Sequence, residues 1–389
     1  MSLGRTPTHE DLYRSTRAAC EARLPETSVF RLLERESHRL FPDEAFADLF
    51  SDIGRSSVPP RIVAVVMVLQ RVHGLSDREA VDAFAFDLRW KYAAGALDFD
   101  YRGFVHTVLC DMRERLRRSE RPNRIFEVVL HVAKQAGLVG RKRVLDSTAL
   151  YDAVTTQDTV TLIRSAIRDL LRKADDELEA TLRSGLKRDD EYRSGGKPAC
   201  DWEDQAAREA LVDELARDGY ASLSALDQRK LGGPLREAAE LLAAVLGQDL
   251  DQGDDGIFRI ARRVAQGRII STVDPEARHG HKTAARGFDG YKGHISVDPD
   301  SEIIVATTVT SGNVADGAMA KELLEEALSE PASTERDGAP AEKVQVYGDA
   351  SYGTVQVVEH IEGAGAEAHV KVQAPSAAEG MFGKDAFRV

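Results

Sequence analysis

The sequence predicts an α/β protein with a mixed sheet and flanking helices, interrupted by a helical insertion and preceded by an all-α N-terminal domain. Three observations lead to this fold class. Apolar residues recur at helical spacing up to about residue 134, and a short apolar strand at 143–146 then precedes a long block rich in Ala, Leu, Glu and Arg. From Gly287 onward the apolar residues alternate instead, which is typical of strands.

Composition narrows the class of protein. The chain has 389 residues, 42% of them hydrophobic and 30% charged, which is ordinary for a globular protein of two or three domains. It contains no apolar run long enough for a membrane span, and its N-terminus lacks an apolar signal core. Its three cysteines form no CxxC pair, which argues against a disulfide framework or a zinc knuckle. A cytoplasmic protein is therefore predicted.

The net charge of −13 is unevenly distributed along the chain. Residues 1–145 carry slightly more Lys and Arg than Asp and Glu, whereas the remainder carries the whole acidic excess. This asymmetry is a weak signal, and it places any DNA-facing surface preferentially in the first part of the chain.

Residues 1–27 are predicted to form a polar lead-in, and residues 28–140 a helical N-terminal domain that binds DNA. Helices are expected over 41–50 and 62–72, and Ser76 with Glu79 forms a capping box for a helix that begins at residue 77. The next helix, from 104 to about 119, carries a basic run. Its arginines suit either the DNA backbone or a solvated helix face, and they are Arg113, Arg115, Arg117 and Arg118, continued by Arg121 and Arg124.

Residues 141–389 are predicted to form the α/β domain, with a helical and acidic insertion at about 152–283. A hairpin of strands 291–298 and 302–310 follows, and Asp316 is expected to cap a helix over 317–329. The last elements are a strand that ends at Asp349, a helix over 355–363 and a strand from residue 368.

Two short apolar strands each end in an aspartate, Asp146 and Asp349. Taken singly, Asp146 could be a helix N-cap and Asp349 a turn residue. Together on neighbouring strands, two carboxylates would repel each other unless a divalent cation bound between them. Such sites activate water or a hydroxyl group for phosphodiester displacement, so the pair predicts a metal site.

Five motifs occur in an order that resembles bacterial insertion-sequence DDE transposases of the InsH type. They are VLDST (144–148), DPEARH (274–279), FDGYKGHISVD (288–298), VTSGNVADG (309–317) and YGDASYG (347–353). The stretch 46–95, with SVPP (57–60) and HGLS (73–76), is similar to the helical N-terminal domain of the same family. The resemblance covers about residues 30–375.

The resemblance implies an RNase H-like core that cuts DNA at the ends of a mobile element and joins it to a target. Asp146 matches the first catalytic aspartate and Asp349 the second, and both would ligate Mg²⁺ or Mn²⁺. The implied partners are double-stranded DNA, as terminal repeats and target, and further copies of the chain in a DNA complex at the bacterial nucleoid. On the hairpin, Lys292 and His294 either contact DNA, support the metal site or are exposed strand residues. Arg113, Arg117 and Arg118 either contact the DNA backbone or lie on a solvated helix face.

The family pattern also requires a third carboxylate, usually in Tyr-x-x-Arg-x-x-x-Glu, and no tyrosine of this chain has Arg at the third position after it. Glu359 and Glu362 follow Asp349 too early for the family's order. A C-terminally truncated transposase is therefore expected. The alternatives are a catalytically inactive, transposase-derived DNA-binding protein and an unrelated metal-dependent nuclease with an RNase H-like core.

Overall fold

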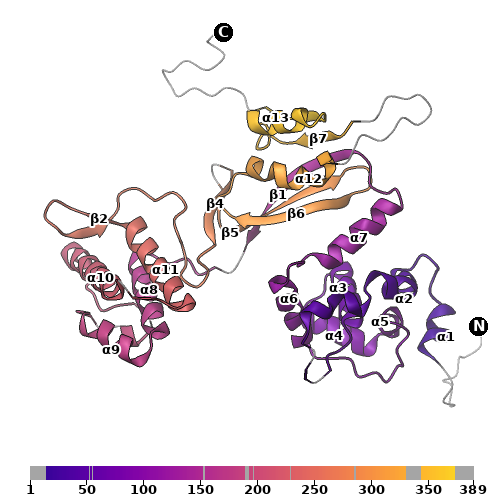
Figure 1. The fold of residues 1–389 in the computed structure, drawn as a ribbon, viewed down its shortest axis with the longest axis horizontal. Helices are drawn as coiled ribbons and strands as arrows, with labels where there is room; N and C mark the ends of the chain where they lie inside the picture. The colour runs from indigo at the N-terminus through magenta and orange to yellow at the C-terminus, as the bar shows by residue number, and fades with distance from the viewer. Residues whose placement is uncertain are drawn as a thin grey trace, which may run out of the picture. The chain divides into compact units, whose positions relative to one another are not determined.

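A computed structural model describes residues 15–372 except 52, 55, 152–153, 189–191, 196, 228, 284–285 and 330–342. The chain divides into two compact units, residues 1–138 and 139–389, whereas the sequence predicted a boundary between 140 and 141. Figure 1 shows the helices of the first unit and the mixed α/β elements of the second, and each unit is treated separately below.

The first unit is helical around one apolar core. Its elements, in chain order, are α1 (Thr16–Glu21), α2 (Val29–Leu40), the 3₁₀ helix η1 (Asp43–Leu49), α3 (Pro60–His73), α4 (Asp77–Phe86), α5 (Leu88–Ala93), α6 (Thr107–Arg118) and α7 (Arg124–Gln135). The helix predicted over 41–50 is therefore a 3₁₀ helix. Part of the predicted lead-in packs as α1, whose Cys20 is buried, and residues 1–14 lie outside the described part.

Helix α3 is the centre of this core, and its ends are set by local sequence. Pro59 precedes its first turn, and Gly74 ends it in the left-handed conformation at φ 64°. Ala64, Val65 and Val66 are fully buried. The predicted capping box of α4 is confirmed, because Ser76 accepts from the backbone of Glu79 and the Glu79 side chain accepts from the backbone of Ser76.

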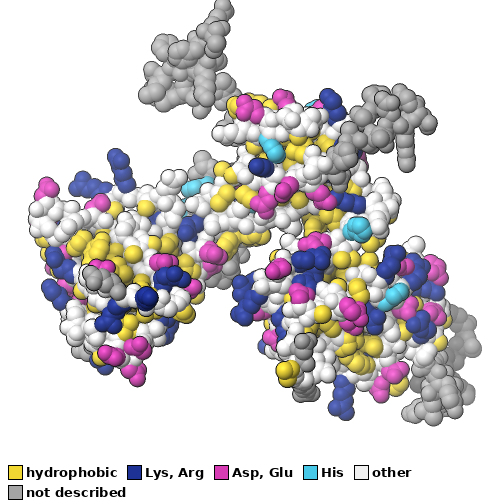
Figure 2. All heavy atoms as spheres, in the orientation of Figure 1, with side chains coloured by type: hydrophobic (Ala, Val, Ile, Leu, Met, Phe, Trp, Pro, Cys, Tyr) yellow, Lys and Arg dark blue, Asp and Glu magenta, His cyan; other side chains and the backbone are white. Residues whose placement is uncertain are grey.

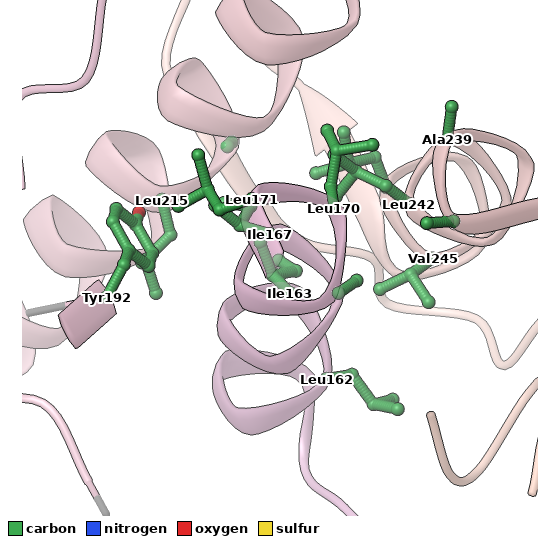
Figure 3. Close-up of a cluster of buried hydrophobic side chains, with 14 of the residues drawn as sticks. Leu162, Ile163, Ile167, Leu170, Leu171, Tyr192, Leu215, Ala239, Leu242 and Val245 are labelled. Atoms are coloured by element: carbon green, nitrogen blue, oxygen red, sulfur yellow. The ribbon is translucent and has the colours of Figure 1, made fainter. Parts of the chain in front are cut away.

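The second unit contains a helical insertion with its own core. Its helices are α8 (Thr159–Lys173), α9 (Asp176–Ser184), α10 (Gln205–Leu226) and α11 (Gly233–Asp249), followed by the small hairpin of β2 (Leu250–Gln252) and β3 (Phe258–Ile260). Figure 3 shows α8 at the centre: Ile167 and Leu171 point toward Leu215, and Leu170 points toward Leu242. Because these side chains are almost fully buried, the insertion packs as a subdomain.

The sheet of the second unit has the strand order β4-β5-β1-β7-β8, with β6 also paired to β5. Its strands are β1 (Lys142–Tyr151), β4 (Arg278–Thr283), β5 (Arg286–Asp298), β6 (Ile303–Ser311), β7 (Gln345–Gly348) and β8 (Glu367–Val370). The predicted hairpin is confirmed as β5 and β6. Residues 278–283, predicted to lie in the insertion, instead form β4 and pair with β5.

The two faces of this sheet differ. Leu145 and Val346 belong to a core with α12 (Ala320–Ser329) and α13 (Val355–Gly363), which cover one face (Figure 1). Because side chains alternate along a strand, Asp146, Thr148 and Leu150 point to the opposite face, and all three are exposed. These two faces are called the covered face and the exposed face below.

Asp298 stabilises the β5–β6 turn and links it to the segment that precedes β1 through hydrogen bonds. Its carboxylate is fully buried and accepts from the backbone N–H groups of Gly140, Asp300 and Ser301. Burial alone would raise the pKa of this carboxyl, but the three N–H donors outweigh burial and hold it below its usual range.

An Asp298→Asn variant should lose about 1–2 kcal/mol of unfolding free energy at neutral pH, because a neutral amide binds three N–H donors less strongly. The charged form stabilises the fold above the carboxyl's unfolded pKa of about 4, and this contribution disappears as the pH falls through the lower folded value. Urea midpoints of the variant and the wild type should therefore converge in acid. Asp300→Asn, at an exposed position in the same turn, is the control; an equal loss in both variants would contradict this role.

Candidate active site

The pairing of β1 with β7 brings the two predicted aspartates together. These strands run parallel, and Leu145 lies opposite Gly348. Asp146 follows Leu145 on β1, and Asp349 follows Gly348, the last residue of β7, so each aspartate comes directly after this paired position. The predicted placement on adjacent strands agrees with this register.

Asp146 itself differs from its prediction in two ways. Strand β1 continues to Tyr151, so Asp146 lies within the strand and caps no helix. It is also exposed, so the predicted cost of a buried carboxylate does not apply. The antiparallel pairing of β1 with β5 explains the longer strand, because residues 144–151 continue to pair with 290–297 after β7 has ended.

Asp349 follows the last residue of β7 and shapes the turn that comes next. Its Oδ1 accepts from the backbone N–H of Ser351 at 2.8 Å, and its carbonyl accepts from Tyr352 at 3.2 Å. The predicted turn role is therefore present. It fixes the carboxylate of Asp349 while leaving the residue exposed at the end of the sheet.

Tyr352 lies beneath this pair of aspartates and was not predicted as a site residue. Its side chain is 1% exposed, and its hydroxyl makes no hydrogen bond of good geometry within the described residues. Burial raises the pKa of this hydroxyl, and the nearby carboxylates of Asp316, Asp146 and Asp349 raise it further. Its position three residues after Asp349 in YGDASYG was the available sequence signal.

Asp316 and Lys292 form an ion pair on the covered face. Lys292 Nζ lies 2.9 Å from Asp316 Oδ1 and donates to the carbonyl of Val314, and both side chains are about 14% exposed or less. Asp316 was predicted to be a helix cap, and this is wrong: the residue lies in the first turn of η3 (Asp316–Met319), where Ala315 occupies the cap position. Lys292 is likewise not a free surface cation.

His294 is fully buried on the covered face, so two of its predicted roles, DNA contact and exposed strand residue, do not fit it. Its Nε2 lies 2.8 Å from Thr310 Oγ1 on the neighbouring strand. Burial lowers the pKa of the imidazole and favours its neutral form. His294 is therefore a packed residue of the sheet, and its position on β5, between two other strands, explains the burial.

Three of the arginines of α6 that were predicted to contact DNA have acidic partners, and the fourth, Arg115, lies over the ring of Phe50. Arg113 pairs with Asp77, while Arg117 and Arg118 both pair with Glu114 at 2.8 and 2.6 Å. The hydrogen bond from Arg117 is the main reason why the pKa of Glu114 falls to about 2. Figure 2 shows dark-blue and magenta side chains mixed over the surface of the first unit. The run of arginines is therefore no uncompensated positive patch.

Within the described residues, no group of three or more His, Cys, Asp or Glu side chains is arranged to hold a metal ion. None of the described helices is both long and apolar enough to cross a membrane.

A Lys292→Met variant should lose about 2 kcal/mol of unfolding free energy, because Asp316 would keep a largely buried charge without its partner. Adding Asp316→Leu should recover most of the loss, which a double-mutant cycle in urea would measure. Lys282→Met, at an exposed position in the same unit, is the control and should change stability by less than about 0.5 kcal/mol. Equal losses at both lysines would contradict the importance of the pair.

Comparison with protein families gives two matches. The model described as "Transposase DDE domain" matches residues 260–381, and the model described as "Transposase domain (DUF772)" matches residues 18–115. The first range contains Asp349, whereas Asp146 lies outside both ranges. Comparisons with curated proteins and with solved structures found no match. The RNase H-like mixed sheet agrees with the predicted family, and the chain contains a transposase DDE domain and an N-terminal transposase domain.

Proposed function

We propose that this transposase is encoded by an insertion sequence and that Asp146 and Asp349 hold the divalent cations, Mg²⁺ or Mn²⁺, with which it cuts and joins DNA. DDE transposases generally use divalent metal ions. The observation that carries the proposal is the register of β1 and β7, which sets the two carboxylates at neighbouring positions at the end of a rigid parallel pair. Two carboxylates so placed favour a bound cation, because it removes their repulsion.

The residues fit such an ion. Carboxylate oxygens are hard ligands, and Mg²⁺ commonly binds one or two protein carboxylates while substrate phosphates and water complete its coordination. Asp146 and Asp349 are both exposed, so a phosphate can reach them.

The protein's own contribution is to fix these two groups and to keep them accessible. Asp146 is held by the paired centre of β1, and Asp349 by its turn with Ser351. Bound cations would activate the attacking water, or later the 3′-hydroxyl, and stabilise the leaving oxygen. The exposed face leaves the DNA backbone free to approach from solvent.

The proposal includes double-stranded DNA as partner, at the element's terminal repeats and at the target. It also includes further copies of the chain in the DNA complex, and a location at the bacterial nucleoid. The third carboxylate of the family pattern has no counterpart in the described residues next to Asp146 and Asp349. This observation favours a second candidate function, a transposase-derived DNA-binding protein that binds the cation without cutting.

Asp146→Asn and Asp349→Asn should each reduce Mg²⁺- or Mn²⁺-dependent nicking of supercoiled DNA by at least about a hundredfold, because each removes a charged ligand of the ion. Glu359→Gln, which removes an exposed carboxylate from α13, is the matched control and should nick like the wild type. Unchanged nicking by either aspartate variant would contradict the site.

The same variants have a readout independent of activity. Mg²⁺ should raise the thermal unfolding temperature of the wild type, and the double variant Asp146→Asn/Asp349→Asn should lose this shift. A cation-dependent shift without any nicking by the wild type would favour the inactive DNA-binding protein. A shift that survives in the double variant would remove these residues as metal ligands.

A further inference from the structure

Residues 259–292 form a basic segment within an otherwise acidic part of the chain. The part of the chain after residue 145 is strongly acidic, yet this segment contains many Lys and Arg residues and, as acids, Asp274, Glu276 and Asp289 alone. Some of its cations form ion pairs within the chain: Arg259 pairs with Asp255, and Arg268 pairs with Asp249. The remaining cations are therefore candidates for an external anion.

The β4–β5 hairpin carries two of these remaining cations, Lys282 and Arg286, at its tip. Both side chains are exposed, and neither makes an ion pair within the part of the chain that the structure describes. His281 pairs with Gly287 and Thr283 with Arg286, so Lys282 and Arg286 lie close together on adjacent strands. This differs from α6, where Arg117 and Arg118 both pair with Glu114, which offsets one of their two positive charges.

A third polar group of the hairpin is fixed in place. His279 Nδ1 lies 2.8 Å from Asp289 Oδ1, and Asp289 Oδ2 accepts from Thr156 Oγ1 at 2.8 Å. The ring lies over Gly287, where an added Cβ would come within 2.9 Å of His279 Cε1. The absence of a side chain at position 287 thus permits this placement. The ring is 54% exposed, so it is held in one orientation at the surface.

His279 of the hairpin lies on the same face of the sheet as the proposed site. His279 lies opposite Asp289 on β5, and Asp289 points to the same side as Tyr291, two residues later. Tyr291 lies opposite Leu150, and Leu150 points to the same side as Asp146 on β1. The face that presents Asp146 therefore continues across β5 to His279.

From these observations we propose that the β4–β5 hairpin is a DNA-backbone contact, in which Lys282, Arg286 and His279 hold phosphates of the duplex whose scissile bond lies at Asp146 and Asp349. The proposal rests on the proposed function for its choice of duplex DNA as the polyanion. It places this contact in the acidic part of the chain and not on the arginines of α6.

The ion pairs already present in the fold explain why the hairpin, and not α6, is proposed as the phosphate contact. A phosphate that approaches Lys282 or Arg286 releases counterions from DNA without breaking an existing ion pair. A phosphate that approaches Arg117 or Arg118 must compete with Glu114, which is held ionised between them. The hairpin is thus the better phosphate contact, although α6 has more arginines.

The test compares two double variants that remove equal charge, Lys282→Ala/Arg286→Ala and Arg117→Ala/Arg118→Ala. Binding of the full chain to a short fluorescent duplex is followed by anisotropy with EDTA present, from about 50 to about 200 mM salt. The hairpin variant should bind at least about tenfold more weakly and lower the salt slope by about 2, as expected for two lost phosphate contacts. The α6 variant should keep the wild-type slope.

Equal effects of the two variants, or no effect of the hairpin variant, would overturn the proposal. Unfolding temperatures within error of the wild type would exclude misfolding as the cause, and exposed positions favour this result. His279→Ala removes the ring whose Nε2 would donate to a phosphate, and it should weaken binding several-fold.

Failure of the proposed function gives a different pattern. Asp146→Asn should bind the duplex as the wild type does in EDTA, since no cation is then present to link the carboxylate to DNA. If Asp146→Asn nicks DNA normally while the hairpin variant loses binding, the metal site is wrong and the hairpin contact stands. If Asp146→Asn stops nicking and the hairpin variant binds normally, the hairpin contact is wrong and the metal site stands.

Discussion

The parallel pairing of β1 with β7 is the constraint on which the second unit depends. The two strands are separated in sequence by the insertion, the β5–β6 hairpin and α12, and the chain must close all of these before residues 142–145 meet 345–348. A long connection costs little more loop entropy than a moderate one, provided that it folds on its own. The insertion meets this condition because α8, α10 and α11 bury their apolar faces against one another. The site can therefore be assembled from distant segments without loss of rigidity.

The sheet divides its two faces between stability and chemistry. On the covered face, Leu145 and Val346 pack under α12 and α13, Lys292 pairs with Asp316, and His294 contacts Thr310. On the exposed face, the same strands present Asp146 and His279 to solvent. This division follows from the period of two along a strand, because successive residues of the motif FDGYKGHISVD point alternately to the covered face and to the exposed face. A motif that looks like one functional unit in sequence thus serves two purposes in the fold.

The sequence predicted those features that depend on local patterns. Helix α13 matches its predicted bounds, the capping box at Ser76 is present, and alternation identified the β5–β6 hairpin. It failed where the environment is set by distant residues. His294 was expected at the surface because alternation gives a face without saying which face is covered. Asp146 was expected at a strand end because the antiparallel partner of residues 146–151 lies more than a hundred residues away.

The distribution of charged residues shows most clearly that the sequence alone does not predict the environment of a side chain. Counting cations along the chain pointed to residues 1–145 and to the arginines of α6, since a count ignores pairing. In the fold, Glu114 lies within about one helical turn of Arg117 and Arg118, pairs with both and offsets one of their two charges. Lys282 and Arg286 belong to a half of the protein that is acidic overall, yet a hairpin places them together and away from its carboxylates. A polyanion responds to the field at its own surface, where screening removes charges more than about 10 Å away, so local compensation outweighs the net charge of a domain.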